Sequence, residues 1–309
     1  MTPLLSAETR LLVQGITGRE AANFTRECLD YGTRVVAGVT PGKGGEQVYG
    51  VPVFDTVSEA VDATQPDAAL LSVPPLGVLD AALEAIDAGI PLLVVITERI
   101  PRRDVAAMLA AGRAAGVTVI GPNSLGAIVP GACKLGSIGG PAQDVRRAYS
   151  PGRVAVVSRS GGMTTEIASM LTGAGIGQSV CVSVGGDALI GTTLLDAYKL
   201  FLDDETTDVV VTFSEPGGAQ EDELADFLEA QGGPPKPLVS FVAGRFVDEM
   251  PGTRFGHAGT MVEAGGSTAR AKIERLGRAG AHVLERLDDL PAAVAAAVGG
   301  ARASREEVA

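Results

Sequence analysis

The stretch LLVQGITGREAANFTRECLDY (residues 11–31) decides the fold, because it joins a buried strand to a helix through a glycine turn. Residues 11–13 are apolar and predict a short strand that ends near Gly15, and residues 19–31 predict the first helix. Glycines in the turn allow close backbone approach, and the helix N-terminus favours a phosphate. The stretch lacks the third glycine of a dinucleotide fingerprint, so a bound nucleotide or phosphate and an ordinary tight turn both stay open.

Outward from this stretch, apolar and β-branched runs alternate with helical patterns. Further strands are predicted at residues 35–39, 68–73, 92–96 and 117–120, and further helices at 57–64, 77–88 and 103–115. Continuous apolar runs are typical of strands that are covered on both faces. The first half therefore predicts a parallel sheet built from βαβ units.

The pattern restarts after a stretch rich in glycine and proline. Strands are predicted at residues 154–157, 179–184, 208–213, 238–242 and 282–284, and helices at 163–174, 192–203, 219–230, 268–279 and 287–297. We therefore expect an α/β protein with two doubly wound domains, 1–130 and 154–300, a connection at 131–153 and a frayed polar tail at 301–309.

Composition excludes several classes of protein. The 309 residues include 25 Lys and Arg against 37 Asp and Glu, a net charge of −12, which argues against a protein that coats nucleic acid. Aromatic residues make up only 4%, so a base-stacking platform is not expected. There is no apolar run of membrane-spanning length and no signal peptide pattern at the N-terminus. Three scattered cysteines suggest a reducing cytoplasm, and no residue spacing predicts a metal site.

Strand-end loops are where parallel α/β sheets bind ligands. The loop GVTPGKGG (38–45) resembles a phosphate-binding loop only superficially, because a glycine follows Lys43 where a serine or threonine is required. A mobile loop and a lysine that grips an anion both stay open. The loops ITERIP (96–101) and GPNSLG (121–126), taken alone, are typical of ordinary connections.

One of the two histidines stands out. His257 lies between small residues, whereas His282 falls in a predicted strand and is interpreted as structural. Glu215 lies on another strand-end loop, and a carboxylate on one ring nitrogen would leave the other nitrogen nucleophilic. The helix N-terminus predicted at residues 160–163 could hold the group that the histidine acquires. A serine-hydrolase triad is disfavoured, because no G-x-S-x-G elbow occurs.

These loops, in this order, resemble the α subunit of succinyl-CoA synthetase (succinate–CoA ligase). The matching stretches include QGITG (14–18), YGTRVVAGVTPGKGG (31–45), VVSRSG (156–161), GIGQSVCVSVGGD (175–187), EPGG (215–218) and GHAG (256–259). They span nearly the whole chain. The resemblance implies a Rossmann-like CoA-binding domain followed by a flavodoxin-like ligase domain that carries a phosphohistidine.

The resemblance also implies roles for individual residues. His257 matches the histidine that becomes phosphorylated, and Glu215 matches the glutamate that orients it. Coenzyme A would be bound by Thr17, Gly18, Arg19, Glu20, Lys43, Ile96, Thr97 and Glu98. Substrate or phosphate would be bound by Ser160, Gly161, Gly162, Thr165 and Asn123.

The implied reaction belongs to an ADP- or GDP-forming carboxylate–CoA ligase of the tricarboxylic acid cycle type. A partner β subunit with an ATP-grasp fold would bind ATP or GTP with Mg²⁺ and phosphorylate His257, in an αβ or α2β2 assembly. The phosphoryl group would pass to a small carboxylate, and the CoA thiol would displace phosphate from the acyl phosphate. The sequence itself has no Walker A motif, which agrees with a nucleotide site on a partner chain.

Departures from the family pattern keep alternatives open. The motif SRSGTLTYE of succinate enzymes is SRSGGMTTE here, so Thr165 replaces a tyrosine, and the substrate could be a hydroxylated, branched or sulfonated acid instead of succinate. Ser124 replaces the cysteine of GPNC, and Ala21 replaces a glycine. A non-catalytic CoA-binding subunit is a further alternative. A dinucleotide oxidoreductase is disfavoured, because the acidic residue expected about 20 positions after the glycine loop is absent near Val39.

Overall fold

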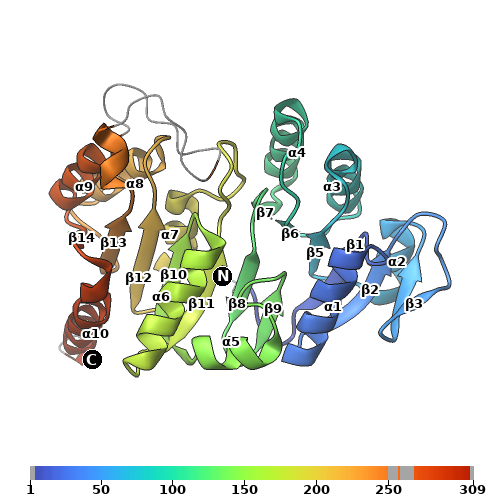
Figure 1. The fold of residues 1–309 in the computed structure, drawn as a ribbon, viewed down its shortest axis with the longest axis horizontal. Coiled ribbons are helices and arrows are strands. Elements are labelled where there is room, and N and C mark those ends of the chain that lie inside the picture. Colours follow the sequence, from blue (N-terminus) through green and yellow to red (C-terminus); the bar gives the residue numbers. More distant parts are fainter. Residues whose placement is uncertain (1–3, 250–256, 258–267, 307–309) are drawn as a thin grey trace. The chain divides into compact units, whose positions relative to one another are not determined.

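The chain folds into two compact α/β units. The computed structural model describes residues 4–249, 257 and 268–306. The N-terminal unit comprises Leu5–Arg146 and Ser183–Thr192, and the C-terminal unit comprises Arg147–Val182 and the chain from Thr193 onward, together with the first residues. Figure 1 colours the elements along the sequence.

The N-terminal unit contains a sheet flanked by helices. Its elements are β1 (Arg10–Gln14), α1 (Arg19–Tyr31), β2 (Arg34–Val39), β3 (Gln47–Val48), β4 (Val51–Phe54), α2 (Val57–Thr64), β5 (Ala68–Leu71), η1 (Pro75–Gly77), α3 (Val78–Asp87), β6 (Leu92–Val95), α4 (Arg102–Ala115), β7 (Thr118–Ile120), β8 (Gly126–Val129), β9 (Cys133–Leu135) and α5 (Ala142–Ala148), whose last two residues belong to the C-terminal unit.

The strand order of this sheet is that of a Rossmann fold. The order is β3-β4-β2-β1-β5-β6-β7, and β1 pairs in parallel with both β2 and β5. Apart from the short antiparallel strand β3 at the edge, the chain order of the strands reads 3-2-1-4-5-6 across the sheet, with the switch point beside β1. The carboxyl end of β1 and the start of α1 therefore occupy the position where such sheets bind ligands.

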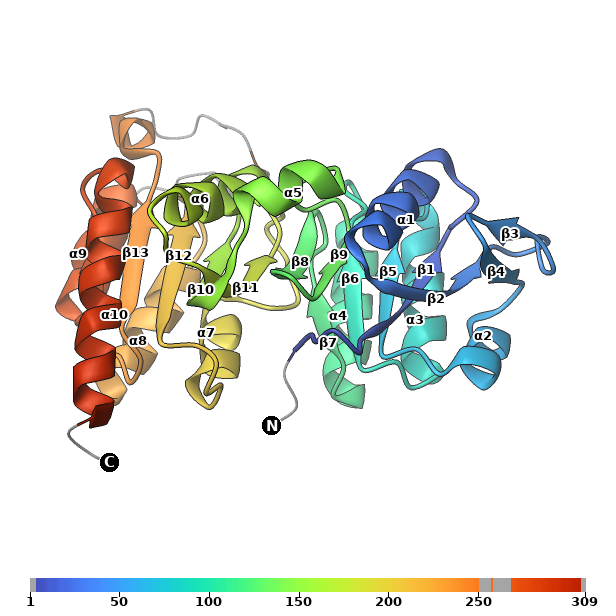
Figure 2. The ribbon, with the colours of Figure 1, turned by 90° about the horizontal axis from the view of Figure 1, so that it is seen from below.

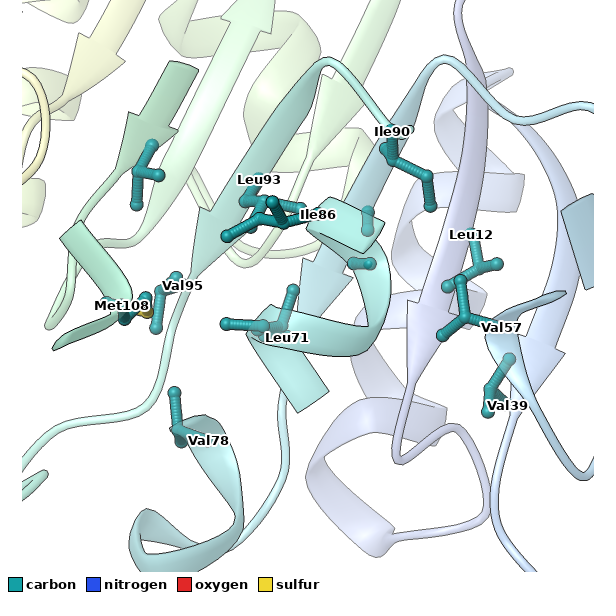
Figure 3. Close-up of a cluster of buried hydrophobic side chains, with 14 of the residues drawn as sticks. Leu12, Val39, Val57, Leu71, Val78, Ile86, Ile90, Leu93, Val95 and Met108 are labelled. Atoms are coloured by element: carbon teal, nitrogen blue, oxygen red, sulfur yellow. The ribbon is translucent and has the colours of Figure 1, made fainter. Parts of the chain in front are cut away.

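The core of this unit lies between the sheet and one layer of helices. Helix α1 covers one face of the sheet, and α2, α3 and α4 cover the other (Figure 2). Side chains from the strands and from these three helices interlock in a single apolar cluster (Figure 3), which includes Leu12, Val39, Val57, Leu71, Val78, Ile86, Ile90, Leu93, Val95 and Met108. Burying this apolar face is the main stabilisation of the layer, and it fixes the strand ends that carry the loops.

The C-terminal unit is a second doubly wound layer structure. Its elements are β10 (Pro151–Ser158), α6 (Gly161–Gly173), β11 (Gln178–Ser183, whose last residue belongs to the N-terminal unit), α7 (Leu194–Leu202), β12 (Val209–Ser214), α8 (Gln220–Ala230), β13 (Leu238–Val242), η2 (Arg245–Glu249), α9 (Ala269–Arg278), β14 (His282–Val283), η3 (Leu287–Asp289) and α10 (Leu290–Glu306).

The strands of this unit follow a flavodoxin-like order. They lie in the order β14-β13-β12-β10-β11, which in chain order reads 2-1-3-4-5 from the other side. Helices α6 and α10 pack together on one face, and α7, α8 and α9 form a continuous layer on the other (Figure 2). The switch point lies between β10 and β12, so the loops after these two strands are the expected ligand-binding loops.

The predicted fold class, with a Rossmann-like unit first and a flavodoxin-like unit second, is confirmed. In two segments the secondary structure differs from what the sequence pattern predicted. The stretch 131–153, expected to be a connection, contains β9, α5 and the start of β10, and β9 pairs antiparallel with β8. Gly126 makes this pairing possible, because its φ is 106° and a side chain there would overlap the carbonyl of Leu135.

The polar tail also differs from expectation. Helix α10 continues through Glu306, because the alanines and charged residues of this segment have high helix propensity. Residues 307–309 lie outside the described residues. None of the helices that the structure describes has both the length and the apolar content to cross a membrane. The expected domain bounds stay a prediction.

All three cysteines are buried and unpaired. Burial raises the pKa of the Cys28 thiol to about 12 and that of the Cys133 thiol to about 11, from an ordinary value of 9.0. Burial also raises the pKa of the Cys181 thiol. Because thiolates are the reactive form, these side chains are protected both by shielding and by protonation.

We expect none of the three thiols to react with a disulfide reagent in the native protein at neutral pH, and all three to react after unfolding in guanidinium chloride. The unfolded thiols ionise near pH 9.0, whereas Cys28 and Cys133 stay protonated up to about pH 12 and about pH 11. The protonated thiols therefore stabilise the folded state below pH 9.0, and this stabilisation is lost as the pH rises from 9.0 to about 11 for Cys133 and about 12 for Cys28. Rapid labelling of a native thiol at neutral pH would contradict the buried placement.

Candidate functional site

Two loops of the C-terminal unit leave the sheet side by side at the switch point. Strands β10 and β12 are parallel neighbours with Ser158 opposite Phe213, and the backbone N–H of Arg159 donates to the carbonyl of Phe213 at 3.2 Å. The segments that follow, which carry Ser160 and Glu215, therefore start from adjacent points on the same sheet edge.

Helix α6 begins directly after the first of these loops. Ser160 is its N-cap, with extended backbone angles and a side-chain oxygen 3.5 Å from the N–H of Met163. Gly161 and Gly162 form the first turn. The N–H groups of a first turn have no partner within the helix, and the helix dipole adds a partial positive charge. This end of α6 is a place where an anion can be held.

His257 and Glu215 form a hydrogen-bonded pair. The Nδ1 atom of His257 lies 2.9 Å and 3.1 Å from the two carboxylate oxygens of Glu215. The side chains are 32% and 16% exposed, so the pair is accessible at its edge and shielded from full hydration. An ionised carboxylate only accepts hydrogen bonds, so Nδ1 carries the proton, and in the neutral ring Nε2 is the nucleophilic nitrogen. The neighbours Gly256, Ala258 and Gly259 lie outside the described residues.

Buried cations lie behind the Glu215 loop. The ammonium group of Lys272 and the guanidinium group of Arg159 both donate to the backbone carbonyls of Glu215 and Gly217. Because Arg159 immediately precedes Ser160, this contact also joins the start of α6 to the Glu215 loop.

Asp248 holds the two ends of the segment that carries His257. Its carboxylate accepts hydrogen bonds from the backbone N–H groups of Ala269 at 2.8 Å and of Arg270 at 3.0 Å. Thr268 caps the same helix start by accepting from the N–H of Ala271. Asp248 thus joins η2 to the start of α9, the two elements that flank the segment with His257.

In the N-terminal unit, α1 starts at the switch point of its sheet. Gly18 is the N-cap and has no side chain to satisfy the first N–H groups, and the exposed Arg19 and Glu20 form the first turn. The hydroxyl of Thr17 lies 3.2 Å from that of Thr40, which follows β2. The loops after β1 and β2 are therefore in contact, and α1 begins directly after the first of them.

The loop with Lys43 is an ordered turn. The Lys43 ammonium, half exposed, pairs with Glu46 at 3.0 Å, and the N–H of Gly44 donates to Asp55 at 2.9 Å. Several backbone bonds close the turn between Thr40 and Val53. The lysine is held at the surface by a carboxylate that an anionic ligand can displace.

A third group of predicted residues follows β6. The Thr97 hydroxyl donates to the carbonyl of Val73 at 2.8 Å, and the Thr97 backbone carbonyl accepts from the N–H of Asn123 at 3.1 Å. The Asn123 side chain donates to Asp187 at 2.9 Å. Ile96 is half-buried, and Glu98 is exposed beside Arg99. Asn123 thus belongs with the Ile96–Glu98 loop of the N-terminal unit.

Thr165 lies one turn into α6, on the same face as Gly161. Its hydroxyl is 2.8 Å from the hydroxyl of Tyr149, a residue that is 3% exposed. Where the family that the sequence resembles has a tyrosine, this chain therefore has the Thr165 hydroxyl beside the Tyr149 hydroxyl.

Within the C-terminal unit, the structure pairs His257 with Glu215, and Arg159 joins the Glu215 loop to the start of α6. Within the N-terminal unit the predicted CoA residues lie after β1 and β2, which are neighbours, and after β6, which β5 separates from β1. Sequence reasoning missed Lys272, Asp248 and Tyr149, for which no motif gives a signal, and it quoted Arg159 in the SRSG motif without assigning a role. His282 is an exposed residue of the edge strand β14.

Two family models match the chain. The model described as a CoA binding domain matches residues 6–99, and the model described as a CoA-ligase matches residues 157–282. The two matches fall on the two sets of loops described above.

Curated relatives match across most of the chain. Archaeoglobus fulgidus succinate–CoA ligase [ADP-forming] subunit alpha 2 is 45% identical over 283 residues, which cover 92% of this chain and 95% of the relative. The corresponding alpha subunit of Aquifex aeolicus is 42% identical over 92% of this chain and 91% of the relative. That of Staphylococcus aureus is 41% identical over 91% and 89%.

Solved structures share the fold. Methanosaeta concilii ATP citrate lyase, solved in complex with (3S)-citryl-CoA, superposes with a TM-score of 0.89 at 26% identity over 96% of this chain. The chain spans 50% of that lyase chain. A dinucleotide-forming acetyl-coenzyme A synthetase from Ca. Korarchaeum cryptofilum superposes with a TM-score of 0.69 at 20% identity over 92% of this chain, which shows a common fold.

We expect His257 to be present as the Nδ1–H tautomer, because Glu215 accepts that proton. Nitrogen NMR of the two histidines tests this, and a His282→Gln background leaves one histidine to observe. In Glu215→Ala the Nε2–H tautomer should become more populated, because the Nδ1–H tautomer loses the carboxylate that accepts its proton. An unchanged Nδ1–H signal in folded Glu215→Ala would show that the carboxylate does not set the tautomer.

Proposed function

Because this chain belongs to the succinate–CoA ligase α-subunit family, we propose that it makes an acyl-CoA through a phosphorylated His257 and an acyl phosphate. The chain is the α subunit of a nucleoside-diphosphate-forming CoA ligase; it binds coenzyme A and works with a β subunit. The observation that supports the phosphohistidine is the hydrogen bond between His257 Nδ1 and Glu215.

The pair fits nucleophilic phosphoryl transfer. In the first step, the Nε2 lone pair of His257 forms a bond to the terminal phosphorus of a nucleoside triphosphate, and the bond from that phosphorus to the bridging oxygen breaks as the diphosphate leaves. The imidazole ring gains positive charge, which the Glu215 carboxylate at 2.9 Å stabilises through Nδ1–H. In the reverse direction the same carboxylate keeps the ring in the tautomer that can be phosphorylated again.

The second step passes the phosphoryl group to the substrate. A carboxylate oxygen forms a bond to phosphorus while the N–P bond breaks, which gives an acyl phosphate and returns neutral His257. The first turn of α6, with Ser160, Gly161 and Gly162, supplies N–H groups and a positive dipole end for the phosphoryl oxygens. Coenzyme A supplies the thiol that takes the acyl group and releases phosphate.

The residues of the N-terminal unit fit coenzyme A. The start of α1, from Thr17 to Glu20, offers N–H groups beside a glycine N-cap, and Lys43 offers a cation for phosphate. The loop from Ile96 to Glu98 adds backbone groups held in place by Thr97 and Asn123. The nucleotide, ATP or GTP with Mg²⁺, is assigned to an ATP-grasp β subunit, in an αβ or α2β2 complex.

We take succinate as the first candidate acid, since it appears in the names of the curated relatives. One observation favours a second candidate, a hydroxylated small acid. Thr165 and Tyr149 place two hydroxyl groups next to each other, one turn along α6 from the proposed phosphoryl site. A pair of hydroxyls can exchange its mutual hydrogen bond for bonds to a polar substituent.

Phosphorylation of His257 is tested with the complex of this chain and its β subunit. With nucleoside triphosphate labelled in the terminal phosphate, we expect acid-labile, base-stable label on this chain, and its loss in His257→Asn. His282→Asn is the matched control and should keep full labelling, because His282 lies on an edge strand. Label that persists in His257→Asn would overturn the proposed phosphohistidine.

Substrate choice is tested by CoA consumption with succinate and with hydroxylated acids of similar size. In Thr165→Tyr we expect turnover of the hydroxylated acids to fall relative to succinate by about tenfold or more, the range for loss of one hydrogen-bond partner or for steric exclusion. A ratio that is unchanged in Thr165→Tyr would show that Thr165 takes no part in selecting the acid.

A further inference from the structure

Lys272 is a fully buried cation whose ammonium group bonds to the Glu215 loop and to the start of α8. It lies in the first turn of α9 with its side chain 0% exposed. Its Nζ atom donates to the carbonyl of Gly217 at 2.6 Å, to the carbonyl of Glu215 at 3.2 Å and to the carboxylate of Glu221. An ammonium group has three donors, and these three acceptors account for all of them.

Arg159 contacts the same two carbonyls from the neighbouring strand-end loop. Its Nη1 atom lies 3.4 Å from the carbonyl oxygen of Glu215 and 3.3 Å from that of Gly217, and the residue is 2% exposed. Each of the two carbonyls is therefore contacted by a lysine and by an arginine. The backbone carbonyls of Glu215 and Gly217 are thus fixed by hydrogen bonds from two positively charged side chains.

Burying these charges is energetically unfavourable. Burial lowers the pKa of Lys272, and the opposing influence is the neighbouring Glu221, whose side chain is also 0% exposed. A buried ion pair is often no more stabilising than apolar side chains of the same size. Stability of the fold alone therefore does not explain why two cations lie here, directly behind the carboxylate that contacts His257.

The contacts also join the segments that carry the reacting groups. Lys272 lies on the helix that follows the His257 segment, and Arg159 lies next to the N-cap of α6. Both reach the backbone of the residue whose side chain contacts His257. A shift of that backbone would move the carboxylate away from Nδ1.

We propose that Lys272, supported by Arg159 and Glu221, is a positioning residue that fixes the backbone at Glu215 and Gly217, so that the Glu215 carboxylate holds His257 in the Nδ1–H tautomer. The inference rests on the proposed function of His257 and deepens it. Lys272 acts through the backbone of Glu215, to whose carbonyl its ammonium group donates.

The experiment compares three variants in the full chain. Lys272→Met removes the donor, and Lys272→Met/Glu221→Leu also removes the carboxylate that would be left buried and unpaired, so that the variant keeps a route to folding. Lys134→Met is the matched control. Lys134 is also 0% exposed and joins the Glu27 carboxylate to the carbonyl of Gly140, but it belongs to the N-terminal unit.

The first measurement is the tautomer of His257 by nitrogen NMR in the His282→Gln background, with circular dichroism to check folding. We expect the Nδ1–H form in the parent and in Lys134→Met, and a mixture with the Nε2–H form in both Lys272 variants. A merely structural role for Lys272 would lower thermal stability without changing the tautomer. A folded double variant that keeps the pure Nδ1–H form would overturn the proposal.

The second measurement is the rate of His257 phosphorylation in the complex with the β subunit. We expect a fall of roughly 100-fold in the Lys272 variants with little change in the nucleotide KM, because misplacement of a catalytic group by about 1 Å has an effect of this size. An unchanged rate in the folded double variant would contradict the positioning role. Absence of label in the parent protein would instead overturn the phosphohistidine, and the tautomer comparison would still test Lys272.

Discussion

Parallel pairing of the strands is the constraint on which both sites depend. In a parallel sheet the carboxyl ends of neighbouring strands lie on one edge, so loops far apart in the sequence start side by side. The pairing of β10 with β12 brings Ser160 and Glu215 together across more than fifty residues of chain, and the pairing of β1 with β2 does the same for Thr17 and Thr40. In each unit one helix begins directly after the first of these loops, α1 after β1 and α6 after β10, and its N-terminus adds positive potential there. The two units thus bring distant loops together in the same way, although their strand orders differ.

Local electrostatics let an acidic chain bind anions. With a net charge of −12, the chain as a whole repels phosphates, so attraction has to come from charges close to the ligand. In the N-terminal unit these are the start of α1 and the exposed Lys43. In the C-terminal unit it is the start of α6, while Arg159 and Lys272 are buried and contact the backbone of the Glu215 loop. The buried cations are unsuited to gripping a ligand directly, and their effect is to order the backbone.

The sequence predicted those features that depend on periodicity and on short-range motifs. The apolar runs located the main strands, and the glycine loops located the ends of β1, β2 and β10, because both signals are local. The β8–β9 hairpin escaped notice, since its strands are short and a glycine is needed only because the Leu135 carbonyl approaches from the partner strand. Lys272 escaped for a similar reason. A lysine in a helical pattern indicates an exposed face, and its acceptors come from residues 215–221, more than fifty positions earlier in the chain. Asp248, likewise, is an ordinary surface aspartate until the chain returns at α9.

The burial of the three cysteines has a consequence for an enzyme that makes thioesters. A thioester transfers its acyl group to any accessible thiolate, because the attacking and leaving groups are chemically alike. Cys28, Cys133 and Cys181 are buried, which raises the pKa values of their thiols, so they offer acyl-CoA neither access nor a thiolate. The same placement prevents mixed disulfides between the chain and free CoA. The chain can therefore hold a reactive acyl donor without becoming acylated itself, and its inert thiols leave the substrate thiol without an internal competitor.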